Sequence, residues 1–240
     1  MEYELNPLGQ PVGLPVEPHV PPRPPRTALD GERCRLEPLD PERHASDIHA
    51  ANLRDVDGRM WTYLAYGPFA TLEEYRRWQE SACKSDDPVF YAIVDRGTGR
   101  AAGIASYLRI DPSNRAIEVG HLAFSPLLQR TALATEAMFL MMRWAFQAGY
   151  RRYEWKCNAL NGPSRTAAMR FGFSYEGVFR QATVVRGRNR DTAWYAAIDS
   201  EWPALEAAYR RWLAPSNFDA DGRQRVPLGE LTAPIVKQRG

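Results

Sequence analysis

A chain of 240 residues is long enough for one ordinary domain with extensions, or for at most two small domains. Its content of 44% apolar and 25% charged residues is that of a globular protein, and a net charge of +2 argues against a dedicated nucleic-acid binder. The sequence has no run of eighteen apolar residues and no apolar leader before a cleavage site, so we expect neither a membrane span nor a secretory signal.

The three cysteines stand far apart, at Cys34, Cys83 and Cys157. An odd number at wide spacing matches neither a disulfide framework nor a metal-binding pattern. We therefore expect free thiols, no bound metal and a reducing, cytoplasmic setting.

Residues 1–30 form a proline-rich N-terminal arm. Proline at this density blocks helix and sheet and favours extended polyproline II. One interpretation is a ligand for a proline-binding module. The absence of a regular P-x-x-P with a basic anchor favours the other, an arm lying on the domain surface or on a partner subunit, as in a homodimer.

Residues 31–199 alternate strand and helix patterns, and the first helices have clear start signals. Asp40 caps a helix that has Pro41 in its first position, and Thr71 with Glu74 makes a capping box for the next. In chain order, the pattern predicts strand 33–39, helix 41–52, helix 72–84, strands 88–95, 101–110 and 118–124, helix 129–149, strand 153–157, helix 163–172 and strands 173–185 and 190–198.

Residues 200–240 are predicted to form a helix followed by a tail. Ser200 caps the helix, which runs through Trp212 with Pro203 in its first turn. From about Ala214 the chain is polar with scattered Pro and Gly, which predicts a disordered tail.

The segment from Glu118 to Thr135 organises the rest of the chain. Its first part has the pattern of a strand, Ser125 to Leu128 make a turn, and apolar residues follow at helical spacing from Gln129. The first backbone N–H groups of such a helix are unpaired and lie at the positive end of its dipole, so the junction is a candidate phosphate site.

Two motifs in this part of the chain resemble a known family. The sequence QRTALA at residues 129–134 resembles the Q/R-x-x-G-x-G/A phosphate loop of the GCN5-related N-acetyltransferases, the GNAT family. The sequence NGPS at residues 161–164, with FGFSYEG at 171–177, resembles that family's second block. Order and separation are similar to the ribosomal-protein alanine acetyltransferase branch, which is RimJ/RimL-like, and the resemblance covers about residues 33–199.

The resemblance implies the α/β GNAT fold. This fold is a mixed, mostly antiparallel sheet of about seven strands with helices on both faces and a splay between two central parallel strands. It implies acetyl-CoA as cosubstrate and direct transfer of the acetyl group to a primary amine, on a protein N-terminus or a small molecule, without a covalent enzyme intermediate. The alternative is a non-catalytic acyl-CoA-binding or scaffolding protein of the same fold.

The resemblance also implies where the cosubstrate binds. Backbone groups of Leu122, Ala123 and Phe124 would bond the pantetheine and the acetyl carbonyl. Backbone amides would hold the pyrophosphate, from Gln129, Arg130, Thr131, Ala132, Leu133, Ala134 and Thr135. Ala132 stands where the family has glycine, so a Cβ lies where the pyrophosphate should come close.

Glu118 and His121 are the candidate bases. A carboxylate on an apolar strand is costly to bury without a partner or a role, and Glu118 matches the base position of the histone-acetylating branch. Its other interpretation is a salt bridge to Arg115 or another arginine. Strand alternation places Glu118, Gly120, Leu122 and Phe124 on one face and His121 on the other, where a hydrogen-bonded structural histidine is the alternative.

Ser164 and Asn161 match the family's N-x-x-S. The resemblance implies that Ser164 protonates or holds the departing thiolate, although both residues also suit a helix cap. The tyrosine that many members use is replaced here by Ala168.

Three aromatic residues precede the second helix: Trp61, Tyr63 and Tyr66. With His121 they would wall the acceptor site, or they would fill the core under a loop. The sequence does not identify the amine acceptor.

Overall fold

A computed structural model describes residues 2–240. Its strands are β1 (Glu4–Leu5), β2 (Pro11–Val12), β3 (Leu29–Asp30), β4 (Cys34–Pro38), β5 (Val89–Asp95), β6 (Ala101–Asp111), β7 (Ala116–Phe124), β8 (Arg152–Asn158), β9 (Ser174–Val185) and β10 (Arg188–Ile198). Its α-helices are α1 (Pro41–Asn52), α2 (Leu72–Ala82), α3 (Ala132–Gln147), α4 (Gly162–Arg170), α5 (Trp202–Leu213) and α6 (Leu228–Thr232). Short 3-10 turns lie at Arg59–Trp61, Asp199–Glu201 and Pro215–Asn217.

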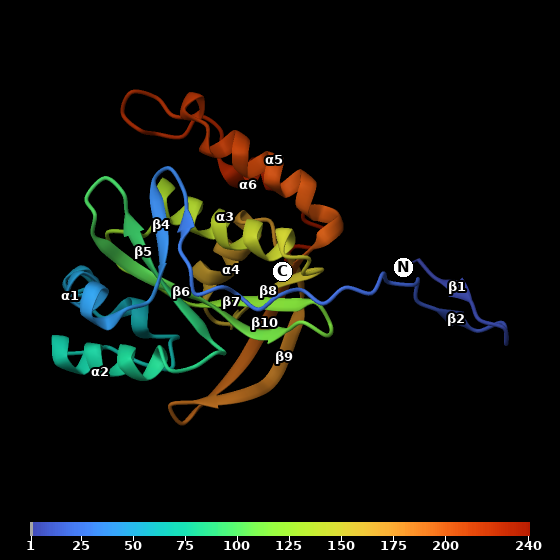
Figure 1. Ribbon diagram of the computed structural model, residues 1–240, viewed down its shortest axis with the longest axis horizontal. Helices are drawn as coiled ribbons and strands as arrows, with labels where there is room; N and C mark the ends of the chain where they lie inside the picture. The colour runs from blue at the N-terminus through green and yellow to red at the C-terminus, as the bar shows by residue number, and fades with distance from the viewer. Residues whose placement is uncertain (1) are drawn as a thin grey trace.

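One mixed sheet forms the centre of the molecule (Figure 1). Its eight strands lie in the order β3-β4-β5-β6-β7-β8-β10-β9. β7 and β8 are parallel because α3 crosses between them, and the other neighbours are antiparallel. The predicted mixed, mostly antiparallel sheet is therefore confirmed, with the two-residue β3 added at one edge.

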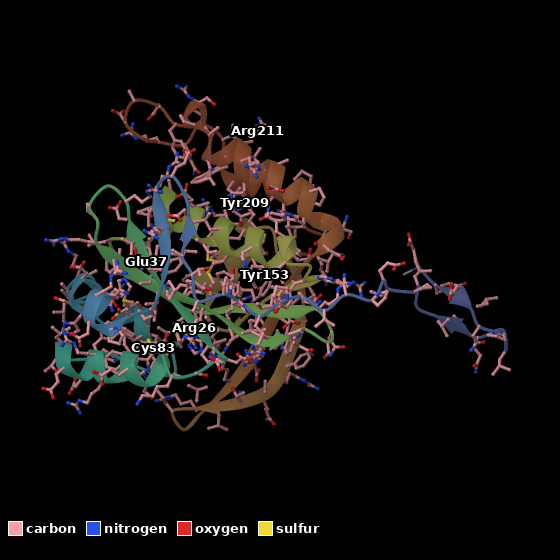
Figure 2. All side chains as sticks on the ribbon, viewed as in Figure 1. Arg26, Glu37, Cys83, Tyr153, Tyr209 and Arg211 are labelled. Carbon is pink, nitrogen blue, oxygen red and sulfur yellow. The ribbon has the colours of Figure 1, made fainter. Side chains whose placement is uncertain are left out.

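Helices cover both faces of the sheet, as predicted (Figure 1). α3, α4 and α5 pack on one face and bury the larger apolar layer, where the labelled Tyr153 and Tyr209 lie (Figure 2). α1 and α2 pack on the other face over a smaller layer. We call these the α3 face and the α1–α2 face.

Two predicted helix starts have the expected caps, and the predicted Ser200 cap is wrong, because Ser200 lies in a 3-10 turn and the N-cap of α5 is Glu201, which makes no side-chain cap bond. Asp40 accepts a hydrogen bond from the Glu42 amide at 2.9 Å, and the capping box of Thr71 and Glu74 is complete. α3 begins later than predicted, at Ala132, because residues 126–130 form the turn and Thr131 is the N-cap.

The two ends of the chain differ in their contacts. Residues 2–16 stand away from the domain (Figure 1), whereas the second half of the arm lies along it and accepts hydrogen bonds from Arg115 at Glu17 and from Tyr150 at Pro22, both at 3.1 Å. The prediction of a disordered tail is wrong: α6 packs there with Leu228 fully buried, and the amide of Tyr175 donates to Gln238 at 2.9 Å.

Within residues 2–240, no helix combines the length and apolar character needed to cross a membrane.

Candidate functional site

β7 and β8 are hydrogen-bonded along only part of their length. Their pairing begins at Ala116 with Arg152 and ends at Val119 with Trp155, whereas β7 continues to Phe124 and β8 to Asn158. The strands separate beyond the last pair, which confirms the predicted splay. In the described chain, the β7 backbone from residue 120 to residue 124 has no strand partner on the β8 side.

A β-bulge at His121 accounts for the separation. The φ angle of His121 is 51°, and the register of β7 against β6 shifts between the pairs Gly120–Ser106 and Ala123–Ile104. A bulge bends its strand and increases the local twist. β7 therefore turns away from β8 at this residue.

The bulge also changes which side chains share a face. The α3 face holds the side chains of Ile117, Val119, Leu122 and Phe124. Glu118 lies between two of these residues on a regular stretch and therefore points to the α1–α2 face. His121 points there too, since its ring lies 5.0 Å from that of Phe90 in the α1–α2 layer. Two predictions are thus wrong: Glu118 does not share a face with Leu122, and His121 does not lie opposite Glu118.

The turn before α3 presents free backbone amides. Among residues 2–240, no acceptor is found for the amides of Arg130, Ala132 and Leu133. Arg130 has a φ of 62°, and successive amides in such a turn form a concave anion site at the positive end of the helix dipole. This part of the predicted phosphate loop is open to a ligand.

Other amides of the predicted loop are already engaged. The Gln129 amide donates to Ser125 at 3.0 Å, and its side chain donates to the Phe124 carbonyl at 2.8 Å. The hydroxyl of Thr131 accepts from the Ala134 amide at 3.1 Å. The amides of Thr131 and Thr135 donate to the carbonyls of Leu128 and Thr131.

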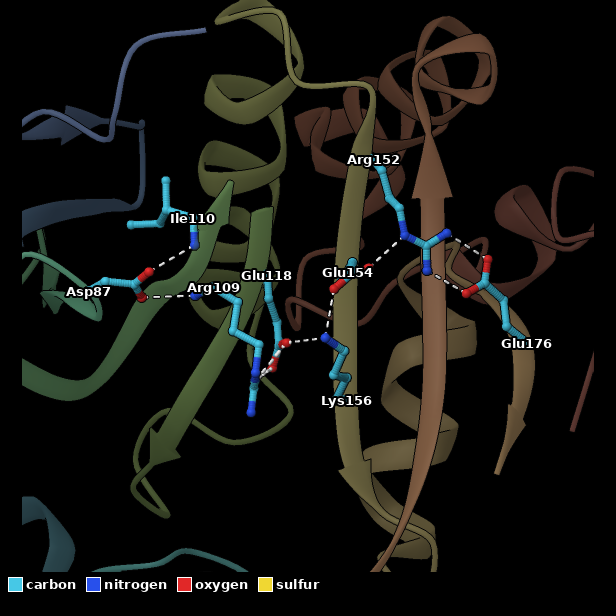
Figure 3. Close-up of polar contacts among 8 residues, drawn as sticks. All are labelled: Asp87, Arg109, Ile110, Glu118, Arg152, Glu154, Lys156 and Glu176. Carbon is cyan, nitrogen blue, oxygen red and sulfur yellow. Dashed lines mark hydrogen bonds and ion pairs between the residues drawn. The ribbon is translucent and has the colours of Figure 1, made fainter. Parts of the chain in front are cut away.

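Glu118 is held between two cations (Figure 3). Nη1 of Arg109 lies 2.7 and 2.8 Å from its two carboxylate oxygens, and Nζ of Lys156 lies 2.9 Å away. Asp87 fixes Arg109 by accepting its backbone N–H at 2.8 Å. The alternative salt bridge of Glu118 therefore exists, but with Arg109 and Lys156 and not with Arg115.

The same contacts continue across β8 to β9 (Figure 3). Lys156 also lies 2.7 Å from Glu154, Glu154 accepts from Arg152 at 2.6 Å, and Nη1 of Arg152 lies 2.8 Å from Glu176. We call the row from Arg109 to Glu176 the ion chain.

Burial controls the electrostatics of Glu118. Its side chain is 3% exposed, and burial raises its pKa above the ordinary value although Arg109 and Lys156 act in the opposite direction. A raised pKa makes a carboxylate a stronger base.

His121 lies among aromatic rings. Its ring stacks on that of Tyr66 at 5.7 Å and lies beside Phe90. Burial, with a smaller contribution from Arg109, lowers the pKa of His121 to about 4. The imidazole is therefore neutral at pH 7.

Ser164 and Asn161 lie at the start of α4, beside the open end of β8. Oδ1 of Asn161 caps the helix by accepting the Ser164 amide at 3.2 Å. Oγ of Ser164 accepts from the indole N–H of Trp155 at 3.1 Å, which leaves the hydroxyl proton available to another acceptor. Burial raises the pKa of the neighbouring Cys157 thiol, so it remains protonated and a poor nucleophile.

The segment between α1 and α2 closes over the α1–α2 face of the splay. The hydroxyl of Tyr63 donates to the carbonyl of Leu160, next to α4, at 3.1 Å. Arg186, at the tip of the β9–β10 hairpin, donates to the carbonyl of Gly67. The segment is therefore tied to both sides of the open end.

The aromatic residues of this segment divide into two groups. Trp61 is buried and packs edge-on against Tyr66 and Phe69, so it fills the core of the segment. Tyr63 and Tyr66 instead contact residues beside the splay: Tyr63 donates to the carbonyl of Leu160, and Tyr66 stacks on the ring of His121.

Sequence reasoning missed Arg109 and Lys156. One signal was present: alternation along residues 152–158 puts Glu154 and Lys156 on one face of a strand whose other face is apolar. Nothing in the sequence joined that face to Glu118.

Comparison with known proteins identifies the family to which this geometry corresponds. Residues 33–174 match the model of the acetyltransferase (GNAT) domain. A GCN5-related N-acetyltransferase from Brucella melitensis is 48% identical and superposes with a TM-score of 0.88 over 91% of this chain and 100% of that one. A GNAT-family protein from Chromobacterium violaceum is 38% identical, with a TM-score of 0.75 over 83% of this chain and 100% of that one.

A curated relative is more distant. The ribosomal-protein-serine acetyltransferase of Escherichia coli is 29% identical over 96 residues, which is 40% of this chain and 54%, about half, of that protein. RimL, a ribosomal L7/L12 alpha-N-protein acetyltransferase solved with coenzyme A, is 23% identical over 72% of this chain and 99% of that one. Its TM-score of 0.60 shows a shared fold.

Proposed function

The chain belongs to the GNAT acetyltransferase family, and we propose that it transfers an acetyl group from acetyl-CoA directly to a primary amine. The observation that carries the proposal is the end of β7–β8 pairing at Val119, beside the free amides at the start of α3. The acceptor would be a protein N-terminus or a small-molecule amine, and the name of the Escherichia coli relative, a ribosomal-protein-serine acetyltransferase, is in keeping with a protein acceptor.

In this proposal the pantetheine lies between β7 and β8 and occupies the place of the missing strand pairing. The backbone of Leu122, Ala123 and Phe124, which has no strand partner on the β8 side, bonds the pantetheine and polarises the thioester carbonyl. The pyrophosphate lies on the amides of the turn before α3. The Cβ of Ala132 leaves less room for the pyrophosphate than a glycine would, while the amide of Ala132 stays free to bind it.

Glu118 is the proposed base, directly or through a water. It lies on the α1–α2 face at the last β7–β8 pairs, and its raised pKa suits it to accept the amine proton. His121 lies on the same face and is neutral, but a pKa of about 4 makes it a weak base. We therefore assign His121 and Tyr63 to the wall of the acceptor site. Trp61 contributes to this wall by packing underneath it, in the core of the segment.

Ser164 is the proposed acid for the leaving thiolate. The indole of Trp155 occupies one lone pair of its hydroxyl, so the hydroxyl proton is free to be donated toward the open end of β8. Free cysteines in the described chain accord with a reducing, cytoplasmic setting.

Titration calorimetry with acetyl-CoA, followed by an assay of CoA release with a panel of amines, tests the proposal. We expect binding in the micromolar range. Glu118→Gln should lower turnover at pH 7 by about a hundredfold with little change in acetyl-CoA affinity, because general-base catalysis contributes about that much. Absence of binding at high micromolar acetyl-CoA would remove the proposal, and unchanged turnover in Glu118→Gln would remove Glu118 as the base.

A second candidate is a non-catalytic acyl-CoA-binding protein of the same fold. The engagement of Glu118 by both Arg109 and Lys156 favours it, since a carboxylate held by two cations is less free to accept a proton. Such a protein would bind acetyl-CoA and release no CoA above the uncatalysed rate with any amine.

The N-terminal arm supports a homodimer as the working assembly. Residues 2–16 stand away from the domain and expose apolar side chains, among them Leu5, Leu8 and Leu14. A two-stranded hairpin this short is not stable in water by itself, so we propose that a second copy of the chain covers it. Light scattering of the full chain should give the mass of two copies, and the mass of one would exclude the dimer.

A further inference from the structure

Arg190 is a cation without an ion-pair partner among residues 2–240, and it lies on the β10 side of the open end of the splay. It comes from β10, and its Nε is buried with no acceptor among residues 2–240. None of the ion pairs in that part of the chain involves its guanidinium. On β10 it lies two residues before Thr192, which pairs with Asn158 at the open end of β8.

The ion chain cannot neutralise this charge, because it is already balanced. It contains three cations and three carboxylates: Arg109, Lys156 and Arg152 with Glu118, Glu154 and Glu176. Burial lowers the pKa of Arg190, but an arginine keeps its charge at neutral pH. The site therefore has one surplus positive charge.

Arg190 points to the side from which an acceptor enters. Alternation along β10 puts Arg190 and Trp194 on one face. Trp194 pairs with Lys156 across the strands, and Nζ of Lys156 lies 3.7 Å from the centroid of its ring, so this is the face of Glu118. The indole N–H of Trp194 is a second buried donor without an acceptor in the described chain.

Building on the proposed function, we propose that Arg190 binds a carboxylate of the acceptor, so that the preferred acceptor is a primary amine with a carboxylate near its nitrogen. A buried donor without an acceptor destabilises the free protein, and a ligand that supplies the acceptor removes that cost. A guanidinium matches a carboxylate through two parallel hydrogen bonds. One surplus cation balances the single charge of a carboxylate, whereas a phosphate dianion would leave negative charge next to Glu118.

Matched pairs of amines test this specificity through CoA release at saturating acetyl-CoA. One pair is L-alanine and L-alaninamide, and the other is the peptide amides Ala-Asp-Ala and Ala-Asn-Ala. In at least one pair we expect the acid to have a kcat/KM at least about tenfold above its amide. The pair that responds tells whether the carboxylate belongs to a free amino acid or to an acidic N-terminus. The alaninamide nitrogen is less basic than that of alanine, so a larger fraction of it is deprotonated at neutral pH. This difference favours the amide, and it therefore cannot explain a preference for the acid.

Three variants assign the preference to Arg190. Arg190→Gln should remove the preference for the acid and leave acetyl-CoA affinity unchanged, and Arg190→Lys should keep part of it. Arg180→Gln removes the same charge from an exposed position on β9 and should keep all of it. Equal use of acid and amide by the unchanged protein, or a preference that survives in Arg190→Gln, would overturn the inference.

A failure of catalysis has a separate signature. If no amine releases CoA, the proposed transferase activity is overturned, and calorimetry of the CoA-loaded protein with the same pairs still tests Arg190. Tighter binding of the acid that is lost in Arg190→Gln supports the inference, and equal binding of acid and amide overturns it.

Discussion

The closed and open halves of the β7–β8 pair are held by different interactions. From Ala116 to Val119, backbone pairing and the ion chain join the two strands. Beyond Val119 neither is present in the described chain, and the strands are kept apart by the bulge at His121. The closed half joins the two strands, and the open half leaves backbone groups for a ligand. The two strands can therefore be paired at one end and separated at the other, because different interactions act on each end.

Removing Lys156 should break the closed half and have the largest effect on stability. Lys156→Met leaves Glu118 and Glu154 buried without the ammonium between them. Loss of one partner from a buried ion pair costs roughly 3 to 5 kcal/mol, and we expect the low end, about 3 kcal/mol, because Arg109 and Arg152 still contact the carboxylates. Urea unfolding at pH 7 measures the change.

Arg210→Met is the matched control for this variant. It removes the surface pair of exposed Arg210 and partly buried Glu206 within α5 and should cost less than about 1 kcal/mol. Equal losses in the two variants would mean that the ion chain contributes no more than a surface pair.

Lowering the pH should act on the open half through His121. The pKa of His121 is about 4 in the folded protein against 6.5 for an ordinary histidine, so between these values the unfolded chain binds a proton that the folded protein does not. Stability is therefore full above pH 6.5 and falls as the pH drops toward 4. His121→Phe keeps the stacking and removes the titration.

The comparison of these two proteins isolates His121, because carboxylates titrate in both. Between pH 7 and pH 4, the unchanged protein should lose about 3 kcal/mol more than His121→Phe in urea unfolding. If the unfolding free energies of the two proteins depended on pH in the same way, protonation of the His121 ring would not destabilise the folded protein.

Removing the cap of α3 should have the smallest effect and separates folding from binding. Thr131→Ala deletes the hydroxyl that accepts from the Ala134 amide and should cost about 1 kcal/mol in unfolding free energy. Thr71→Ala at the start of α2 should cost about as much, but only Thr131→Ala should also weaken acetyl-CoA binding in calorimetry. Equal acetyl-CoA affinities would place the phosphates away from this turn.

Most features that depend on neighbouring residues could be predicted from the sequence, although the Ser200 cap is absent. The caps at Asp40 and at Thr71 with Glu74 have the expected bonds because side chain and amide are two or three residues apart. The order of strands and helices in the domain was also predictable, with the help of the family resemblance. α3 nevertheless starts three residues later than its apolar spacing indicates, since the turn before it also carries leucines.

Features that depend on distant residues could not be predicted. The bulge at His121 is formed by the pairing of β7 with β6. It turns every later residue of β7 to the opposite face of the sheet. The contacts of Glu118 with Lys156 join strands separated by α3. The order of the C-terminal tail rests on burial of Leu228 among residues remote in the sequence, which its polar composition conceals.

The sequence by itself determined the family, the alternation of strands and helices, and the position of the turn that we propose binds phosphate, because motifs, caps and periodicity are carried by residues close along the chain. Only the tertiary structure decided where β7 and β8 part, which side chains meet Glu118, and that Arg190 lacks a partner. Those properties are set by burial and by pairing between distant strands, and neither quantity exists until the sheet is assembled.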